Sequence, residues 1–169
     1  GEKAKGLVTI KGSLFYFDPN TGERLSGWRR VKGKLYYFGK NGAALTGKQK
    51  IGKYQYYFSR NGVLQKDTLI QRTYYAGKRG QLASGWIHYG VNDYYFDPVT
   101  FRMYTGWREI KGKHYYFNAY GQLVKGRMVG KTWYVNESGE RQYGWVDAGT
   151  KRYYLDPDTG KAAKNGWYV

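Results

Sequence analysis

The stretch "GWREIKGKHYYFNAYGQLVKG", residues 106–126, decides the fold, because the chain repeats it. A close copy, "GWRRVKGKLYYFGKNGAALTG", occupies residues 27–47. The gap between the repeats at Gly47 and Gly85 holds a degenerate copy, residues 68–84, which has lost the opening Gly-Trp. Self-similarity with a period near 20 residues is typical of a solenoid. Aligned on the glycine before the tryptophan position, the recognisable repeats open at Gly27, Gly47, Gly85, Gly106, Gly126, Gly144 and Gly166.

Each repeat predicts a β-hairpin. An aromatic strand such as Tyr36, Tyr37 and Phe38 precedes a turn at Asn41-Gly42 and a short partner strand at Ala44. An isolated hairpin is marginal in water, so each repeat must bury one aromatic face against its neighbours. We therefore predict an all-β fold, a β-hairpin solenoid of about eight ~20-residue repeats, with residues 1–169 forming a single elongated repeat domain. Strand alternation assigns a structural role to Tyr36, Phe38, Tyr56, Phe58, Tyr94, Phe96, Tyr115 and Phe117.

The composition limits the classes of function. The 169 residues carry a formal net charge of +17, which favours encounters with polyanions. No segment approaches the roughly 20 consecutive apolar residues that cross a bilayer, so we expect no membrane insertion. The chain has no cysteine, which excludes disulfides and thiolate metal sites.

The sequence offers little to catalysis. His88 and His114 lie in different repeats and fit no metal-binding or catalytic spacing. The twelve acidic residues lie largely in turns. Residues 156–160, "DPDTG", begin like an EF-hand calcium loop, but the glutamate that such a loop needs at its twelfth position is missing. We therefore expect no enzymatic activity, no cofactor and no metal.

The recurring pattern Gly-Trp, Gly-Lys, Tyr-Tyr-Phe and Gly-x-Leu resembles the cell-wall-binding repeat family. That family includes choline-binding modules of Gram-positive surface proteins, glucan-binding modules of glucansucrases and the repeats of clostridial toxins. The resemblance implies a left-handed β-solenoid with ligands in shallow grooves between consecutive repeats. It also implies that the chain is the C-terminal part of a larger secreted protein, associated with the cell surface.

The resemblance further implies that choline would need three aromatic walls: the tryptophan after glycine, an aromatic residue just before the Tyr-Tyr pair, and one from the next repeat. A cation–π cage weakens with each missing wall. Lys48, Leu69 and Arg127 replace the tryptophan in three repeats. A choline-binding module remains an alternative, but the glucan-binding and toxin branches resemble the chain more closely. No aromatic residue stands before the pair, where the chain has Leu14, Leu35, Gln55, Thr73, Asp93, His114, Thr132 and Arg152.

Sugars bind exposed aromatic faces rimmed by polar groups, so the tryptophans and second tyrosines are the candidate site residues. Sealing one hairpin against the next is the structural alternative. We expect the strongest groove between the repeats that open at Gly85 and Gly106, where Trp86, Tyr95, Trp107 and Tyr116 would meet, with His88, Asp93, Arg108 and His114 around them. The further candidates are Trp28, Trp145, Tyr57, Tyr134 and Tyr154.

The function that these features favour is a non-catalytic carbohydrate-binding anchor. Its partner would be a bacterial cell-wall polysaccharide, a teichoic-acid-type polymer or a glucan, bound by a monomer or dimer. Single-stranded nucleic-acid binding, or binding of another polyanion, is an alternative, because basic and aromatic residues also interleave in such proteins. Nucleic acid is disfavoured because no known nucleic-acid-binding motif is present. The recurring lysines Lys34, Lys53, Lys113 and Lys131 either protect strand edges or contact an anionic polymer.

Overall fold

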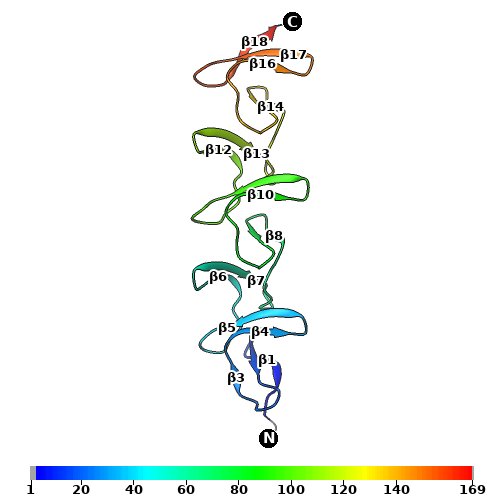
Figure 1. Ribbon diagram of the computed structural model, residues 1–169, viewed down its shortest axis with the longest axis vertical. Coiled ribbons are helices and arrows are strands. Elements are labelled where there is room, and N and C mark those ends of the chain that lie inside the picture. Colours follow the sequence, from blue (N-terminus) through cyan, green and yellow to red (C-terminus); the bar gives the residue numbers. More distant parts are fainter. Residues whose placement is uncertain (1–2, 169) are drawn as a thin grey trace. The chain divides into compact units, whose positions relative to one another are not determined.

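The computed structural model describes residues 3–168, with side chains as far as residue 163, and every regular element in this part of the chain is a β-strand. The strands pair into eight small antiparallel sheets, which confirms the prediction of about eight hairpin repeats (Figure 1). The first strands are β1 (Gly6–Ile10), β2 (Ser13–Phe17), β3 (Arg24–Leu25), β4 (Gly27–Val31), β5 (Lys34–Phe38), β6 (Gly47–Ile51), β7 (Tyr54–Phe58), β8 (Thr68–Ile70) and β9 (Tyr74–Ala76). They are followed by β10 (Gly85–Tyr89), β11 (Asn92–Phe96), β12 (Gly106–Ile110), β13 (Lys113–Phe117), β14 (Arg127–Val129), β15 (Trp133–Val135), β16 (Gly144–Ala148), β17 (Lys151–Leu155) and β18 (Ala162–Tyr168).

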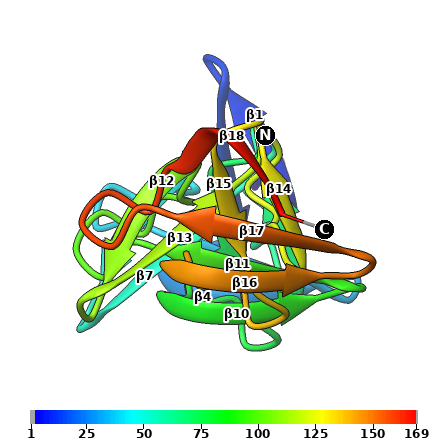
Figure 2. The ribbon, with the colours of Figure 1, turned by 90° about the horizontal axis from the view of Figure 1, so that it is seen from above.

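The contacts divide the chain into two units, a first unit (Gly1–Ala83) and a second unit (Ser84–Val169). Within the second unit, successive hairpins point in different directions, and β16 returns to the direction of β10 (Figure 2). Each unit therefore consists of hairpins that are stacked and rotated, as in a solenoid. The single domain predicted over residues 1–169 stays a prediction.

The hairpin within each repeat differs from the predicted one. The Gly-Trp strand, not the segment at Ala44, is the partner of the Tyr-Tyr-Phe strand, and Gly27 lies opposite Phe38. Lys32 and Gly33 form the turn, both with positive φ, 47° and 76°. Two consecutive residues with positive φ give the type I′ turn, whose twist matches that of paired strands. The Lys-Gly dipeptide therefore makes the hairpin, and the prediction of Asn41-Gly42 as its turn was wrong.

The loop at Asn41-Gly42 instead joins one hairpin to the next. Ala44 makes a single bridge to Phe38, and its backbone N–H donates to the carbonyl of Leu14 in the preceding hairpin. The same backbone hydrogen bond recurs from Leu64 to Leu35 in the first unit and from Leu123 to Asp93 in the second. The residue before each aromatic pair thus holds the next repeat through its backbone.

The core of each unit combines buried aromatic side chains with aliphatic ones such as Leu64 and Leu155. Phe38 and Phe58 in the first unit, and Phe96 and Phe117 in the second, are completely buried. Tyr36, Tyr94 and Tyr115 are also buried, and Tyr56 is half-buried, as strand alternation predicts. Burial of these apolar side chains therefore stabilises the stacking of the hairpins within each unit.

Two hairpins, β8–β9 and β14–β15, are shorter than the others. In β14–β15, Met128 lies opposite Tyr134, the position that Trp107 takes opposite Tyr116. Arg127 lies opposite Val135. The prediction that Arg127 replaces the tryptophan is therefore wrong by one residue, because the shorter strands shift the register.

Candidate functional site

A cleft of about 340 Å³ opens in the second unit between hairpins β10–β11 and β12–β13. Trp86 forms one wall, with its ring 5.0 Å from Tyr115 and 5.2 Å from Tyr95, both in edge-to-face geometry. These contacts fix the indole, yet 43% of the residue remains exposed. A ring that is held rigidly and partly exposed is a platform for a ligand. The lining consists of Trp86, Asp93, Tyr115, Leu123, Lys125, Ser138 and Glu140.

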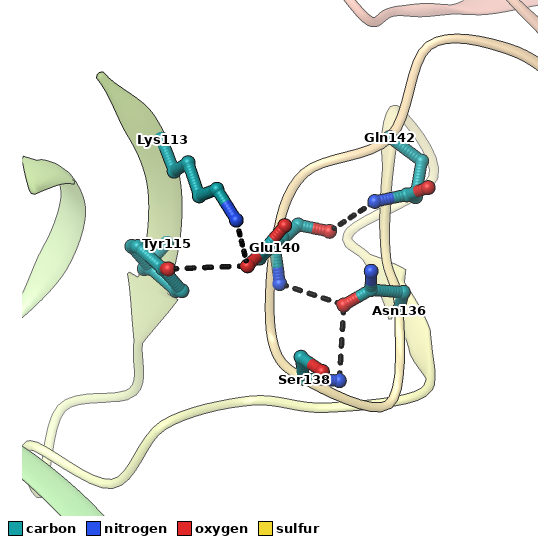
Figure 3. A network of polar contacts seen from close by, with 6 residues as sticks. All are labelled: Lys113, Tyr115, Asn136, Ser138, Glu140 and Gln142. Carbon is teal, nitrogen blue, oxygen red and sulfur yellow. Dashed lines mark hydrogen bonds and ion pairs between the residues drawn. The ribbon is translucent and has the colours of Figure 1, made fainter. Parts of the chain in front are cut away.

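Two carboxylates stand at the rim of this cleft. Asp93 Oδ1 lies 2.7 Å from His88 Nδ1, and its other oxygen accepts a hydrogen bond from Lys125. Glu140 Oε1 accepts from Lys113 Nζ at 2.7 Å and from the Tyr115 hydroxyl at 3.4 Å (Figure 3). Both carboxylates therefore join residues from different repeats across the cleft.

Glu140 is held in place by its own loop. The Asn136 side-chain oxygen accepts hydrogen bonds from the backbone N–H groups of Ser138, at 3.0 Å, and Glu140, at 2.9 Å (Figure 3). Gln142 donates its amide to the carbonyl of Glu140 at 3.0 Å. The loop is thus closed by local hydrogen bonds, which fix the position of the carboxylate relative to Tyr115.

The hydrogen bonds of the rim shift the pKa values of Asp93 and Lys113. The hydrogen bond from Lys125, followed by that from His88, lowers the pKa of Asp93 below its ordinary value. The hydrogen bond to Glu140 raises the pKa of Lys113. The general acid of a glycosidase needs a raised pKa, so Asp93 does not have the property that this role requires. The rim offers hydrogen-bond acceptors and donors, which suit sugar hydroxyls.

The four aromatic residues predicted to meet in one groove form two separate pairs. Trp86 contacts Tyr95, while Trp107 lies 5.3 Å from Tyr116. The wall that faces Trp86 from the next hairpin is Tyr115, to which strand alternation had given a purely structural role. Trp107 meets Trp133 of its next hairpin at 5.5 Å.

A cation lies over the ring of Trp107. The guanidinium of Arg141 lies 5.6 Å from the centre of the Trp107 ring and 5.1 Å from that of Tyr143. Arg108 lies over Tyr104 rather than over either tryptophan. His114 is 3.9 Å from Glu109 of its own hairpin. Trp107 is therefore half-buried, whereas Trp86 remains exposed although Tyr95, Tyr115 and Phe117 pack against it.

The remaining predicted residues lie in several environments. In the first unit, Trp28 contacts Tyr56 at 5.2 Å, and Tyr57 contacts Tyr74 at 6.0 Å. In the second unit, Trp145 is 52% exposed and contacts Tyr154 at 5.1 Å. Tyr134 is buried, and desolvation raises its pKa, so its ring has little surface to offer a ligand.

Sequence reasoning missed Lys125, Ser138 and Glu140. They come from the loops that follow later hairpins, so their contact with Trp86 depends on the stacking of repeats rather than on spacing along the chain. The backbone hydrogen bond from Leu123 to Asp93 indicates which loop approaches Trp86, but it can be recognised only once the strand register is known.

Among the described residues, no group of three potential ligands is arranged to hold a metal ion. Likewise, the part of the chain that the structure describes contains no helix long and apolar enough to span a membrane.

Comparison with known proteins identifies relatives of the whole repeat array. Residues 104–135 match the choline-binding repeat, and residues 26–44 match the putative cell wall binding repeat. Glucosyltransferase-S of Streptococcus downei is 29% identical over 99% of this chain, which spans only 12% of that enzyme. Choline binding protein F of Streptococcus pneumoniae, solved with a peptidoglycan analogue, superposes with a TM-score of 0.73 at 32% identity, over 84% of this chain and 48% of that one.

A further solved structure supports the fold. CbpJ of Streptococcus pneumoniae gives a TM-score of 0.78 over 99% of this chain and 72% of its own, at 23% identity. The repeat matches, the sequence relatives and the superposed folds all point to the same kind of repeat. The chain therefore carries repeats of the cell-wall-binding family at residues 26–44 and 104–135, and its sequence relatives and fold support the same family for the rest of the array.

Proposed function

We propose that this chain is a non-catalytic module that binds a bacterial glycan, a wall polysaccharide or a glucan, and attaches a larger secreted protein to it. The observation that carries the proposal is the cleft of Trp86 and Tyr115. It combines an exposed, rigid indole with the carboxylates of Asp93 and Glu140 and the donors of Lys125 and Ser138.

These groups match the surface of a pyranose ring. The C–H groups of a sugar stack on an aromatic face, while its hydroxyls need acceptors and donors around the ring. The two carboxylates are already oriented by Lys125 and Lys113, so little side-chain freedom is lost when a hydroxyl binds. A volume of about 340 Å³ suits one or two sugar residues at the lower end of the range for ligand pockets.

Family membership supports this proposal. The relatives include a glucosyltransferase and a choline-binding protein solved with a peptidoglycan analogue, so the repeats occur in proteins that act on or bind bacterial polysaccharides. Binding by several weak grooves on one chain would gain avidity through effective concentration. Cell-surface association is consistent with the same relatives.

The test compares the chain with its Trp86→Ala variant in binding to insoluble α-glucan and to purified cell walls. Losing an aromatic platform costs about 1–3 kcal/mol, so we expect binding to weaken roughly ten- to hundredfold. Trp86→Phe, which keeps a ring, is the matched control and should retain most of the binding. Equal binding by wild type and a folded Trp86→Ala variant would contradict the proposal.

A further inference from the structure

The positive charge is divided unequally between the two units. The first unit has 17 lysines and arginines and 4 acidic residues, a formal charge of +13, whereas the second has 12 and 8, a charge of +4. Four carboxylates cannot neutralise seventeen cations. Of these four, Asp18 accepts hydrogen bonds within its own turn, and Asp67 accepts from the Tyr75 hydroxyl at 2.6 Å.

A groove of about 330 Å³ in the first unit collects part of this charge. It lies between the turn of hairpin β4–β5 and the loop after β7, and its lining includes the exposed Lys34 and Lys66. The guanidinium of Arg30 reaches the same turn, 3.4 Å from the carbonyl of Gly33. The lining is Gly33, Lys34, Leu35, Val63, Leu64, Gln65 and Lys66. It combines cations with an aliphatic floor.

This groove is the counterpart of the cleft of Trp86 and Tyr115 in the second unit, which we call the glycan cleft. The two sites correspond because the same backbone hydrogen bond occurs in both: the N–H of Leu64 donates to the carbonyl of Leu35, as that of Leu123 donates to Asp93. In the second unit, Asp93 neutralises Lys125 and contacts His88. In the first unit the same positions hold Leu35, Lys66 and Arg30, and Lys34 stands where the second unit has Asn92. The carboxylate that neutralises one groove is therefore replaced by an apolar side chain in the other.

The chemistry of the lining selects the kind of anion. A nucleic acid would need exposed rings on which its bases could stack. The groove lining contains no aromatic residue, and the nearby Trp28 packs against Tyr37 and Tyr56. Aliphatic side chains flanked by ammonium groups suit a polymer with a flexible, non-aromatic backbone and a phosphate in each repeat.

We propose that the groove between Lys34 and Lys66 is a second binding site, which takes the phosphates of a phosphodiester-linked wall polymer of the teichoic-acid type. It uses none of the residues of the glycan cleft. The module thus has two kinds of site, one for a sugar ring and one for a phosphate chain, and their ligands compete little with each other.

The experiment measures binding of polyglycerol phosphate of defined length to the full chain and to Lys34→Asn/Lys66→Gln, at several salt concentrations. Both lysines are exposed, so the fold is preserved. We expect affinity at low salt to fall about tenfold, and the slope of log K against log salt to decrease by about two, one for each lost phosphate contact. The charge-matched control is Lys50→Asn/Lys78→Asn, which removes two exposed cations outside the groove and should have a smaller effect on affinity.

A second pair of variants exchanges the two grooves. Leu35→Asp gives Lys66 a partner, as in the second unit, and should weaken binding, whereas Asp93→Leu frees Lys125 and should strengthen it. An effect of the control equal to that of the groove variant would overturn the proposal. So would tighter binding of a single-stranded oligonucleotide of equal charge, which would assign the surface to nucleic acid. Trp86→Ala should leave polyglycerol phosphate binding intact, so the two proposed sites fail or succeed separately.

Discussion

The indole of Trp86 lies 5.0 Å from the phenol ring of Tyr115, which belongs to the next hairpin along the chain. The first unit repeats this relationship between Trp28 and Tyr56, at 5.2 Å. One tryptophan therefore seals two repeats together while part of its ring remains exposed in the cleft between them. Packing and ligand binding are not alternatives for Trp86, because different parts of the same ring are available for each.

The stability of the stack should depend most on its fully buried phenylalanines. Phe117→Ala should lower the free energy of unfolding by about 3–5 kcal/mol, the usual cost of removing a buried ring. Phe117→Leu should cost less than about 1.5 kcal/mol, because Leu155 is fully buried at the same register position, opposite Gly144. Urea denaturation of the two variants checks this difference. Equal losses would mean that ring shape, not filled volume, stabilises the repeat.

Stability should decline in acid through the aspartates of the turns. Hydrogen bonds from the Thr100 backbone and hydroxyl lower the pKa of Asp97 from an ordinary 3.8 to about 2. A lowered folded-state pKa contributes stability above the unfolded value, and this contribution is lost as pH falls from about 4 towards 2. Asp97→Asn should therefore be less stable than wild type at pH 7 and nearly equal to it below pH 2. Thermal melts of both proteins across this range provide the test; a constant difference would contradict it.

Choline at millimolar concentration should not stabilise the protein. In the Trp86 cleft, the position of the missing wall holds Asp93, whose carboxylate is already engaged by His88 and Lys125. The ammonium of Lys125 also repels a second cation, and cation–π binding weakens without a complete set of rings. Melting temperature measured against choline concentration decides the matter. A saturable rise that disappears in Trp86→Ala would restore the choline-binding alternative.

Much of the fold could be predicted from the sequence, because its signals are local and repeated. The aromatic pairs and the glycines before tryptophan correctly predicted about eight hairpins. They also correctly predicted that Tyr36 and Phe38 are buried. The prediction of the partner strand was wrong. Asn41-Gly42 is the stronger hairpin-turn signal in the sequence, yet the hairpin turns at Lys32-Gly33. The resemblance to the cell-wall-binding repeats is also confirmed, because residues 26–44 and 104–135 match models of such repeats.

The candidate site was only partly accessible from the sequence. Trp86, Asp93 and His88 were identified because they lie in one repeat. Glu140 contacts Tyr115 from a loop 25 residues further along the chain, and nothing in the local pattern indicates that contact. The length of the short hairpins decides which residue lies opposite Tyr134, so Met128 could be placed only once the strand register was known.

The central claim, that a sugar binds on Trp86, is tested most directly by recording the indole N–H signals of the 15N-labelled chain during titration with a soluble gluco-oligosaccharide or peptidoglycan fragment. The Trp86 signal, assigned with the Trp86→Phe variant, should shift progressively and saturate. The signal of Trp28, whose counterpart groove lacks the carboxylates of Asp93 and Glu140, should move much less. A Trp86 signal that stays fixed while the glycan demonstrably binds would contradict the account.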